Sequence, residues 1–202
     1  FSDLLQYTIN EEDKRQFIDI IKTNNERLLK IIDDVLDLSK IESGTMKFII
    51  EPIDLESIFK ETYEVFSHQQ VLSKVKIIYE KPYSSCIIDI DRVRITQVLT
   101  NFITNAVKYT EEGHIRMGYE CIDGGIKIFV EDTGQGISRD CKDSLFEPFE
   151  KLDSFVQWTG LGLSICKDIS KIFKGKIGVE SDKGEGSTFW MWVPGECKIT
   201  RI

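Results

Sequence analysis

Apolar residues recur at helical spacing over two long stretches of the chain. In the first stretch, Asn10 is expected to cap a helix that ends near Ser43, with Gly44 as its stop. Its seam alternates at spacings of four and three residues and runs through Phe17, Ile21, Asn24, Leu28, Ile31, Val35 and Leu38. The stripe is wide enough for a helical bundle, and residues 1–7 are expected to be only the tail of a preceding helix. We therefore expect a second copy of the chain to complete a dimeric four-helix bundle; the alternative is packing on the following domain.

The second helical stretch, residues 91–110, is expected to be capped by Asp91, and it separates an apolar face from a polar one. The apolar positions are expected to pack into a core: Leu99, Phe102, Ile103 and Ala106. Asn101, Asn105 and Lys108 stand at i, i+4 and i+7, so they share the other face. Amide oxygen is a hard ligand suited to Mg²⁺, and a lysine tip can meet phosphate oxygen. The alternative is an ordinary solvated face.

Shorter patterns predict the remaining elements. Strands are expected at 46–50 (ended by Pro52), 75–80, 86–90, 115–122, 126–131, 177–181 and 187–193, and helices at 55–70 and 161–173. Asp123-Gly124-Gly125 predicts a hairpin turn, and Gly175 is expected to close the last helix. The order indicates an α+β fold: a helical-hairpin remnant, then an α/β sandwich with helices on one face of a mixed sheet. The domain boundary is expected near Gly44.

Composition and charge exclude several kinds of binding partner and site. The 202 residues carry a net charge of −8, which argues against nonspecific binding to nucleic acid or to an anionic membrane. Five cysteines without metal-type spacing predict reduced thiols in the cytosol and argue against a disulfide framework or a zinc site. No apolar run is long enough to cross a bilayer, so a membrane anchor is expected only outside this chain. The chain begins at Phe1 rather than Met, and we expect it to be a fragment.

Glycine-bearing stretches follow the second helix. Asp132-Thr133-Gly134-Gln135-Gly136-Ile137 comes after a strand, where a carboxylate can accept a hydrogen bond from an exocyclic amine. Thr159-Gly160-Leu161-Gly162-Leu163-Ser164 opens a helix, whose free N–H groups suit phosphate. For the glycines of residues 184–189 a structural role is favoured over ligand contact. Residues 146–149, Phe-Glu-Pro-Phe, are expected either to pin a loop or to pack in the core.

In this order and spacing, these motifs resemble the catalytic part of a sensor histidine kinase of two-component systems. That family belongs to the ATPase superfamily of gyrase, the heat-shock chaperone ATPases and the mismatch-repair ATPases. Residues 1–44 resemble the C-terminal part of the dimerisation and histidine phosphotransfer hairpin. Residues 45–202 resemble the ATP-binding catalytic domain, so the resemblance covers essentially the whole chain.

The resemblance implies ATP and Mg²⁺ as cofactors and assigns roles to individual residues. Asn105 would hold Mg²⁺ with assistance from Asn101, and Lys108 would meet phosphate. Tyr109 would lie near the nucleotide, and Asp132 would bind the adenine amino group. The residues implied for the pocket, the lid hinge and the phosphate cradle are Gly134, Gly136, Thr159, Gly160, Leu161, Gly162 and Leu163.

The resemblance also implies an enzyme and its partners. An ATP:protein-histidine phosphotransferase would pass its phosphate to an aspartate on the receiver domain of a response regulator. It would act as a homodimer, in the cytoplasmic part of a membrane-anchored sensor. Relatives that hydrolyse ATP carry a glutamate where this chain has Asn101, which favours kinase chemistry over an ATP-driven clamp.

Two features depart from the family pattern. The phosphoaccepting histidine is absent: only His68 and His114 occur, and both are expected to be structural or exposed. Trp158 stands where the family has glycine before Thr159-Gly160, and either restricts the lid or borders missing lid residues. The alternative function is therefore a nucleotide-binding scaffold, a pseudokinase with a lid restricted by Trp158.

Overall fold

The structure is a computed structural model that describes residues 10–69, 74–142, 144–148 and 160–201. It divides into two compact units, Phe1–Met46 and Lys47–Ile202. The helices are α1 (Glu11–Glu42), α2 (Leu55–Gln69), α3 (Arg92–Tyr109), α4 (Arg139–Lys142) and α5 (Gly162–Ile172). The strands are β1 (Glu51–Asp54), β2 (Val75–Glu80), β3 (Ser85–Ile90), β4 (Gly113–Ile122), β5 (Gly125–Asp132), β6 (Lys176–Ser181), β7 (Ser187–Pro194) and β8 (Lys198–Thr200).

The described part of the first unit is the single long helix α1. It begins after Asn10, whose side chain accepts a hydrogen bond from the Glu12 N–H at 2.9 Å, and it is capped by Ser43. Gly44 follows with a φ of +65°, so the predicted start and stop of this helix are both confirmed. Its apolar stripe includes side chains that are 45–62% exposed: Ile18, Leu28, Leu29, Ile32, Val35 and Leu36. The predicted helix tail at residues 1–7 lies outside the described residues.

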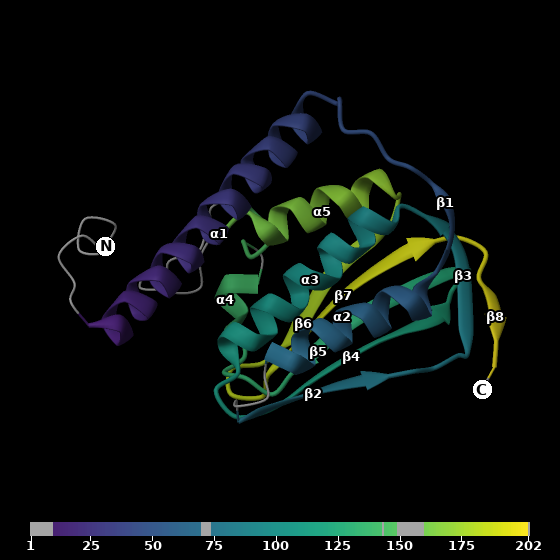
Figure 1. Cartoon of the computed structure of the whole chain (residues 1–202). Helices are drawn as coiled ribbons and strands as arrows, with labels where there is room; N and C mark the ends of the chain where they lie inside the picture. The colour runs from purple at the N-terminus through teal and green to yellow at the C-terminus, as the bar shows by residue number, and fades with distance from the viewer. Residues whose placement is uncertain (1–9, 70–73, 143, 149–159, 202) are drawn as a thin grey trace. The chain divides into compact units, whose positions relative to one another are not determined.

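The second unit is built on a five-stranded sheet. The strand order is β2-β4-β5-β7-β6, in which β2 and β4 are parallel and the other neighbours are antiparallel. The sheet is therefore mixed, and α2, α3 and α5 lie on one of its faces, as the sequence predicted (Figure 1). The hairpin between β4 and β5 turns at Asp123 and Gly124, which both have positive φ, so the strong turn signal there is confirmed.

The core lies between the three helices and the sheet. All four residues predicted for the buried face of α3 are at most 1% exposed: Leu99, Phe102, Ile103 and Ala106. Phe102 packs against Phe189 of β7 with ring centroids 5.7 Å apart, and Phe59 of α2 packs against Tyr119 of β4 at 4.8 Å. Aromatic pairs at these distances add to the stability that burial of their area provides. They hold α2 and α3 against the sheet.

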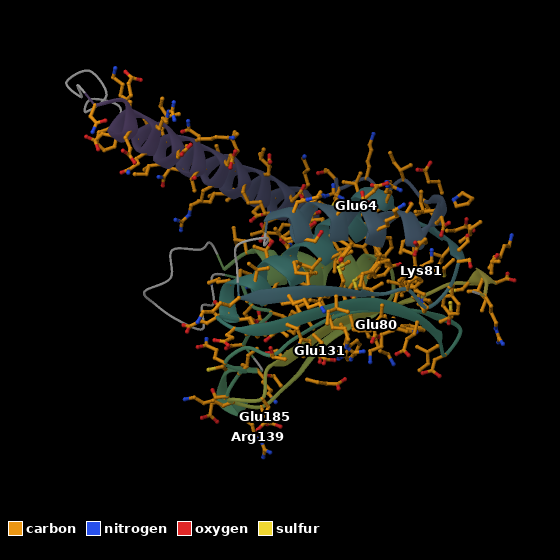
Figure 2. All side chains as sticks on the ribbon, turned by 60° about the horizontal axis from the view of Figure 1, so that its bottom comes forward. Glu64, Glu80, Lys81, Glu131, Arg139 and Glu185 are labelled. Carbon is orange, nitrogen blue, oxygen red and sulfur yellow. The ribbon has the colours of Figure 1, made fainter. Side chains whose placement is uncertain are left out.

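The opposite face of the sheet carries charged and amphipathic side chains. Arg116 forms ion pairs with Glu80 at 2.7 Å and with Glu131, joining three neighbouring strands. Figure 2 labels Glu80 and Glu131 on the sheet side of the unit and Glu64 on the helical side. These contacts identify the face that is turned away from the helices.

A second, three-stranded sheet was not predicted. Its order is β1-β3-β8, and both pairings are antiparallel. The strand expected at 46–50 is wrong: Ile49 and Ile50 are 69% and 53% exposed, and the strand is Glu51–Asp54. It tolerates Pro52, which lacks an N–H, because β1 lies at the edge of the sheet and pairs only with β3.

The helix α5 is capped at Phe173, and Gly175 closes it as predicted, because its N–H donates to the Ser170 carbonyl oxygen at 2.8 Å. The residue with left-handed backbone at this end is Lys174, with a φ of +57°. Gly175 is needed for another reason: a Cβ there would overlap the carbonyl oxygen of Trp192. Among the described residues, no helix is both long and apolar enough to cross a membrane.

Candidate functional site

The helix α3 carries the predicted site residues in its second half and is anchored at its start. The Asp91 side chain accepts from the Arg94 N–H at 3.0 Å, which confirms the predicted cap. Its second carboxylate oxygen accepts from the Ile49 N–H at 2.8 Å. One side chain therefore caps the helix and holds the incoming chain against it.

Asn101 faces the beginning of α5. Its side chain is 7% exposed, and its amide nitrogen donates to the Gly162 carbonyl oxygen at 3.2 Å and approaches the Cys166 Sγ at 3.5 Å. A Cβ on Gly162 would lie 3.3–3.4 Å from the Asn101 amide group, which is tighter than ordinary contact. Asn101 thus sets the spacing between α3 and α5, and its oxygen remains the atom suited to a ligand.

Asn105 and Lys108 lie further along α3 and are partly buried. Asn105 has no side-chain hydrogen bond to any residue that the structure describes. The Lys108 Nζ lies 2.5 Å from the Tyr109 hydroxyl and 4.3 Å from the centroid of that ring. This part of the helix therefore presents an amide with no side-chain partner among the described residues, one turn before a cation.

Asp132 ends β5 and is 5% exposed. Its Oδ1 accepts from the Gly134 N–H at 2.8 Å. Burial raises the pKa of this carboxyl, while the backbone N–H groups of Gly134 and Ser187 act in the opposite direction. A buried carboxylate at a strand end is a directional acceptor for an N–H group of a ligand.

The loop after Asp132 is pinned from two sides. The Gln135 N–H donates to the Tyr109 carbonyl oxygen at 3.2 Å, and the Gly184 N–H donates to the Gln135 carbonyl oxygen at 2.8 Å. A Cβ on Gly134 would overlap the Tyr109 carbonyl oxygen, and one on Gly136, where φ is +64°, would overlap that of Asp182. Both glycines are therefore required by close packing inside the protein, a reason that the sequence analysis missed.

The turn between β6 and β7 completes this corner. Gly186 has a φ of +83°, and a Cβ there would overlap the carbonyl oxygen of Asp132. The Ser181 hydroxyl donates to the Gly186 carbonyl oxygen at 2.7 Å and accepts from the Ile137 N–H at 2.8 Å. Figure 2 shows Glu185 at the same end of the unit as Arg139 of α4. These contacts bear out the structural role predicted for the third glycine stretch.

The first turn of α5 has backbone N–H groups that could bind an anionic ligand. Gly160 has a φ of +69°, and Leu161, the N-cap, is buried and makes no capping hydrogen bond through its side chain. The N–H groups of the first turn point out of the helix at its positive end. Leu163 is partly buried in this turn. Thr159 lies outside the described residues, as does Trp158.

The segment before α5 is held to it by a surface ion pair. Glu147 pairs with Lys167 at 2.7 Å, and this cation lowers the pKa of Glu147. Phe146 is partly buried, and Phe149 lies outside the described residues. The described part of the Phe-Glu-Pro-Phe motif therefore fastens the loop to α5.

The two histidines have different surroundings. His68 is exposed near the end of α2. His114 is in β4, where its N–H donates to the Thr133 hydroxyl at 3.0 Å and its carbonyl oxygen accepts from the Thr133 N–H at 3.2 Å. Both match the structural or exposed roles that were predicted.

The structure arranges the predicted residues in two groups along α3. Asn101 meets α5 at Gly162, and Tyr109 meets the loop that begins at Asp132. Eight residues of helix separate Asn101 from Tyr109, which corresponds to about 12 Å. Asn105 and Lys108 lie between these ends, so α3 connects a carboxylate corner with a helix N-terminus.

Two protein families match parts of the chain. Residues 90–196 match the family described as "Histidine kinase-, DNA gyrase B-, and HSP90-like ATPase", and residues 1–44 match the "His Kinase A (phospho-acceptor) domain". Hybrid signal transduction histidine kinase B of Dictyostelium discoideum is 35% identical over 96% of this chain. The chain spans only 10% of that relative's length.

Solved structures show the same fold. Full-length ShkA in complex with AMPPNP superposes with a TM-score of 0.81 and 28% identity, over 98% of this chain and 42% of that one. The histidine kinase ThkA in complex with the response regulator protein TrrA gives a TM-score of 0.71 and 26% identity, over 93% of this chain and 53% of that one.

Proposed function

Because the chain belongs to the histidine kinases of two-component signalling, within the ATPase family that they share with DNA gyrase B and HSP90, we propose that it is a phosphotransferase core. It binds Mg²⁺-ATP and directs the γ-phosphoryl to a histidine. The observation that carries this proposal is α3 itself, which joins the Asp132 corner to the start of α5. An elongated nucleotide with one basic ring system and one anionic end matches those two surroundings.

The adenine end is assigned to Asp132 and Tyr109. The carboxylate of Asp132 accepts a hydrogen bond from the adenine amino group, and Tyr109 lies beside the ring. Gly134 and Gly136 hold the corner in shape through their close contacts with Tyr109 and Asp182. The complex of the similar protein ShkA with AMPPNP supports an adenine nucleotide as the ligand.

The phosphate end is assigned to Lys108 and the first turn of α5. Lysine meets phosphate oxygen as a point charge, and the N–H groups following Gly160, Leu161 and Gly162 face the anion. Leu163, and Thr159 outside the described residues, complete the cradle. A helix N-terminus with no side-chain cap is suited to this task.

Two side-chain amides of α3 fit the metal assignment. The Asn105 side chain makes no hydrogen bond with a described residue, and its oxygen is a hard donor of the kind that Mg²⁺ prefers. The Asn101 oxygen is the second candidate, because its nitrogen is already engaged by Gly162. The residues fit Mg²⁺, which when bound would neutralise charge on the phosphates.

The contact between Asn101 and Gly162 also favours transfer over hydrolysis. A carbonyl oxygen accepts hydrogen bonds, so it is satisfied by an amide N–H and repelled by a carboxylate. A glutamate at this position, which relatives that hydrolyse ATP use to activate water, would lose that contact. With no such base at position 101, the γ-phosphoryl is kept for another nucleophile.

The remaining proposals concern organisation. Residues 1–44 are the C-terminal part of the phosphotransfer hairpin and residues 45–202 the catalytic domain. A second copy of the chain covers the exposed apolar stripe of α1, and a receiver domain accepts the phosphate, as the ThkA–TrrA complex suggests by similarity. The five cysteines are unpaired, and we place this part of the protein in the reducing cytosol.

The test is phosphotransfer to the missing histidine. A longer version of the protein that includes the preceding helix and its histidine is incubated with γ-labelled ATP, beside a variant with that histidine replaced by glutamine. We expect acid-labile, base-stable label in the first protein and none in the variant. Bound ATP without label in either protein would favour the nucleotide-binding scaffold.

A further inference from the structure

Three cysteines that are far apart in the sequence meet at one place in the fold. Cys86 comes from β3, Cys121 from β4 and Cys197 from the link between β7 and β8. Their Sγ atoms all lie within 4.8 Å of one another, and those of Cys86 and Cys121 are 3.7 Å apart. The spacing along the chain argued against a zinc site, but the fold assembles a thiol cluster that this spacing conceals.

Two of the three cysteines lie on strands, and the third lies in the short link between β7 and β8. In the three-stranded sheet Cys86 pairs with Ile199, and in the five-stranded sheet Cys121 pairs with Ile126. The Cys86 N–H donates to the Asp54 carboxylate at 2.9 Å. The Cys197 thiol approaches the Gly125 carbonyl oxygen at 3.6 Å. The three sulfurs are therefore positioned by both sheets and need little ordering to act together.

The spacing of the sulfurs matches a metal site. In tetrahedral thiolate sites the metal–sulfur distance is about 2.3 Å, which places the sulfurs about 3.8 Å apart. The Sγ atoms of Cys86 and Cys121 are 3.7 Å apart, which matches this value. The Cys197 Sγ lies within 4.8 Å of both, so a small rotation of its side chain would bring it to the same spacing. Three soft donors select thiophilic cations over Mg²⁺ or Ca²⁺.

We propose that Cys86, Cys121 and Cys197 bind one thiophilic d¹⁰ cation, with Zn²⁺ as the physiological class. On binding, three S–H bonds break, three sulfur–metal bonds form and three protons pass to the solvent. Water completes the tetrahedron, and a divalent ion leaves the site with one negative charge. The ion links the two sheets of the catalytic unit.

The site is separate from the proposed nucleotide site. Ile126, the partner of Cys121, stands six residues before Asp132 on β5, which corresponds to about 20 Å along the strand. The cation therefore has no part in phosphoryl transfer. It stabilises the end of the sheet that lies furthest from Asp132.

The spacing of the thiols fits a metal better than a disulfide. The Sγ atoms of Cys86 and Cys121 lie 3.7 Å apart, whereas a disulfide joins its sulfurs at about 2.05 Å. A cation can bridge sulfurs at the observed spacing, and a disulfide would need them to move together.

Titration of the reduced full chain with Cd²⁺ tests the proposal, because Cd–thiolate bonds give an ultraviolet charge-transfer band. We expect the band to saturate at one equivalent per chain and Zn²⁺ to displace it. No band, or saturation at several equivalents without displacement by Zn²⁺, would overturn the proposal. So would a loss of two hydrogens by mass in the metal-free protein, since that would show a disulfide.

Matched variants identify the ligands. Cys121→Ser should lower the Cd²⁺ affinity about 100-fold or more, because it removes one of three thiolates. Cys141→Ser is the control, since Cys141 is also partly buried but lies outside the cluster. Cys197→Ser provides a second variant in a non-strand segment, should Cys121→Ser fold poorly. Equal loss of affinity in Cys141→Ser, or unchanged affinity in both cluster variants, would overturn the assignment.

Discussion

The two ends of the site along α3 are built differently. At Tyr109, the loop of residues 132–137 is held by backbone hydrogen bonds to α3 and to the β6–β7 turn, and its glycines fill spaces that admit no side chain. At Asn101, a side-chain amide links α3 to α5 through Gly162. The corner proposed for adenine is thus part of the rigid framework, whereas the end proposed for phosphate includes a contact made by one side-chain amide.

This difference suits the proposed chemistry. A rigid carboxylate corner selects the base before any transfer step, because its geometry does not need to form on binding. The end proposed for phosphate must admit an anion and release it after transfer, and the first turn of α5 there has no side-chain cap over its N–H groups.

The largest effect is expected at Gly136. Gly136→Ala places a Cβ on the Asp182 carbonyl oxygen at a φ of +64°, so it combines overpacking with backbone strain. We expect the free energy of unfolding in urea to fall by about 3–4 kcal/mol. Gly124→Ala is the matched control, because its φ is +71° and nothing lies within 4 Å of the added Cβ. We expect a fall of only about 1–2 kcal/mol there. Similar losses in the two variants would show that the corner is not tightly packed.

The next largest effect is expected for Asp132→Asn, which should change nucleotide binding while leaving the packing of the loop intact. Asp132→Asn keeps an acceptor for the Gly134 N–H but weakens the bond to the adenine amino group. ATP affinity by calorimetry should fall about 10- to 100-fold, the value of one charge-assisted hydrogen bond. In the unmutated protein ATP should bind more tightly than GTP. Equal affinities for the two nucleotides would refute the role of Asp132.

The pH dependence of stability gives a second measurement on the same variant. Burial raises the pKa of Asp132 above its unfolded value, so the folded protein holds this proton more tightly. The contribution of Asp132 to stability therefore declines as pH rises from the usual carboxyl range through its raised pKa. In Asp132→Asn, the free energy of unfolding should change less with pH over that range. A curve with the same slope as the unmutated protein would show that Asp132 does not titrate there.

The smallest effect is expected at Asn101. Asn101→Asp replaces the donor to the Gly162 carbonyl oxygen by a carboxylate and should cost about 1–2 kcal/mol of stability. Asn101→Asp should also weaken binding of the phosphate groups, and Asn101→Gln, which keeps an amide, should recover part of that affinity. Thermal unfolding measures the loss of stability. The ratio of the ATP and ADP affinities measures the binding of the terminal phosphate. An unchanged melting temperature in Asn101→Asp would show that the hydrogen bond from Asn101 to Gly162 does not stabilise the packing of α3 on α5.

Local signals were sufficient for most of the fold. Caps at Asn10 and Asp91, the Asp123-Gly124 turn and the period of apolar residues located helices and strands, because each depends on residues close in sequence. The edge strand containing Pro52 and the short strand β8 were missed. Pairing with β3 creates both strands, and no nearby residue signals a partner that distant.

The site was predictable to the extent that it lies on one helix. The spacing of Asn101, Asn105 and Lys108 follows from helical geometry, whereas the contact of Asn101 with Gly162 spans 61 residues and depends on how α5 packs. The thiol cluster was missed for the same reason, since it needs three separate segments. Glycine motifs were located correctly, but their close contacts appear only in the fold.

The most direct test of the proposed site is the Mg²⁺ dependence of ATP binding in Asn105→Ala. ATP is titrated in Mg²⁺ and in EDTA for this variant and for the unmutated protein, with thermal unfolding as a check on the fold. We expect Mg²⁺ to strengthen ATP binding only in the unmutated protein and the melting temperature to be unchanged, because the Asn105 side chain makes no hydrogen bond with a described residue. Equal strengthening by Mg²⁺ in the variant would contradict it.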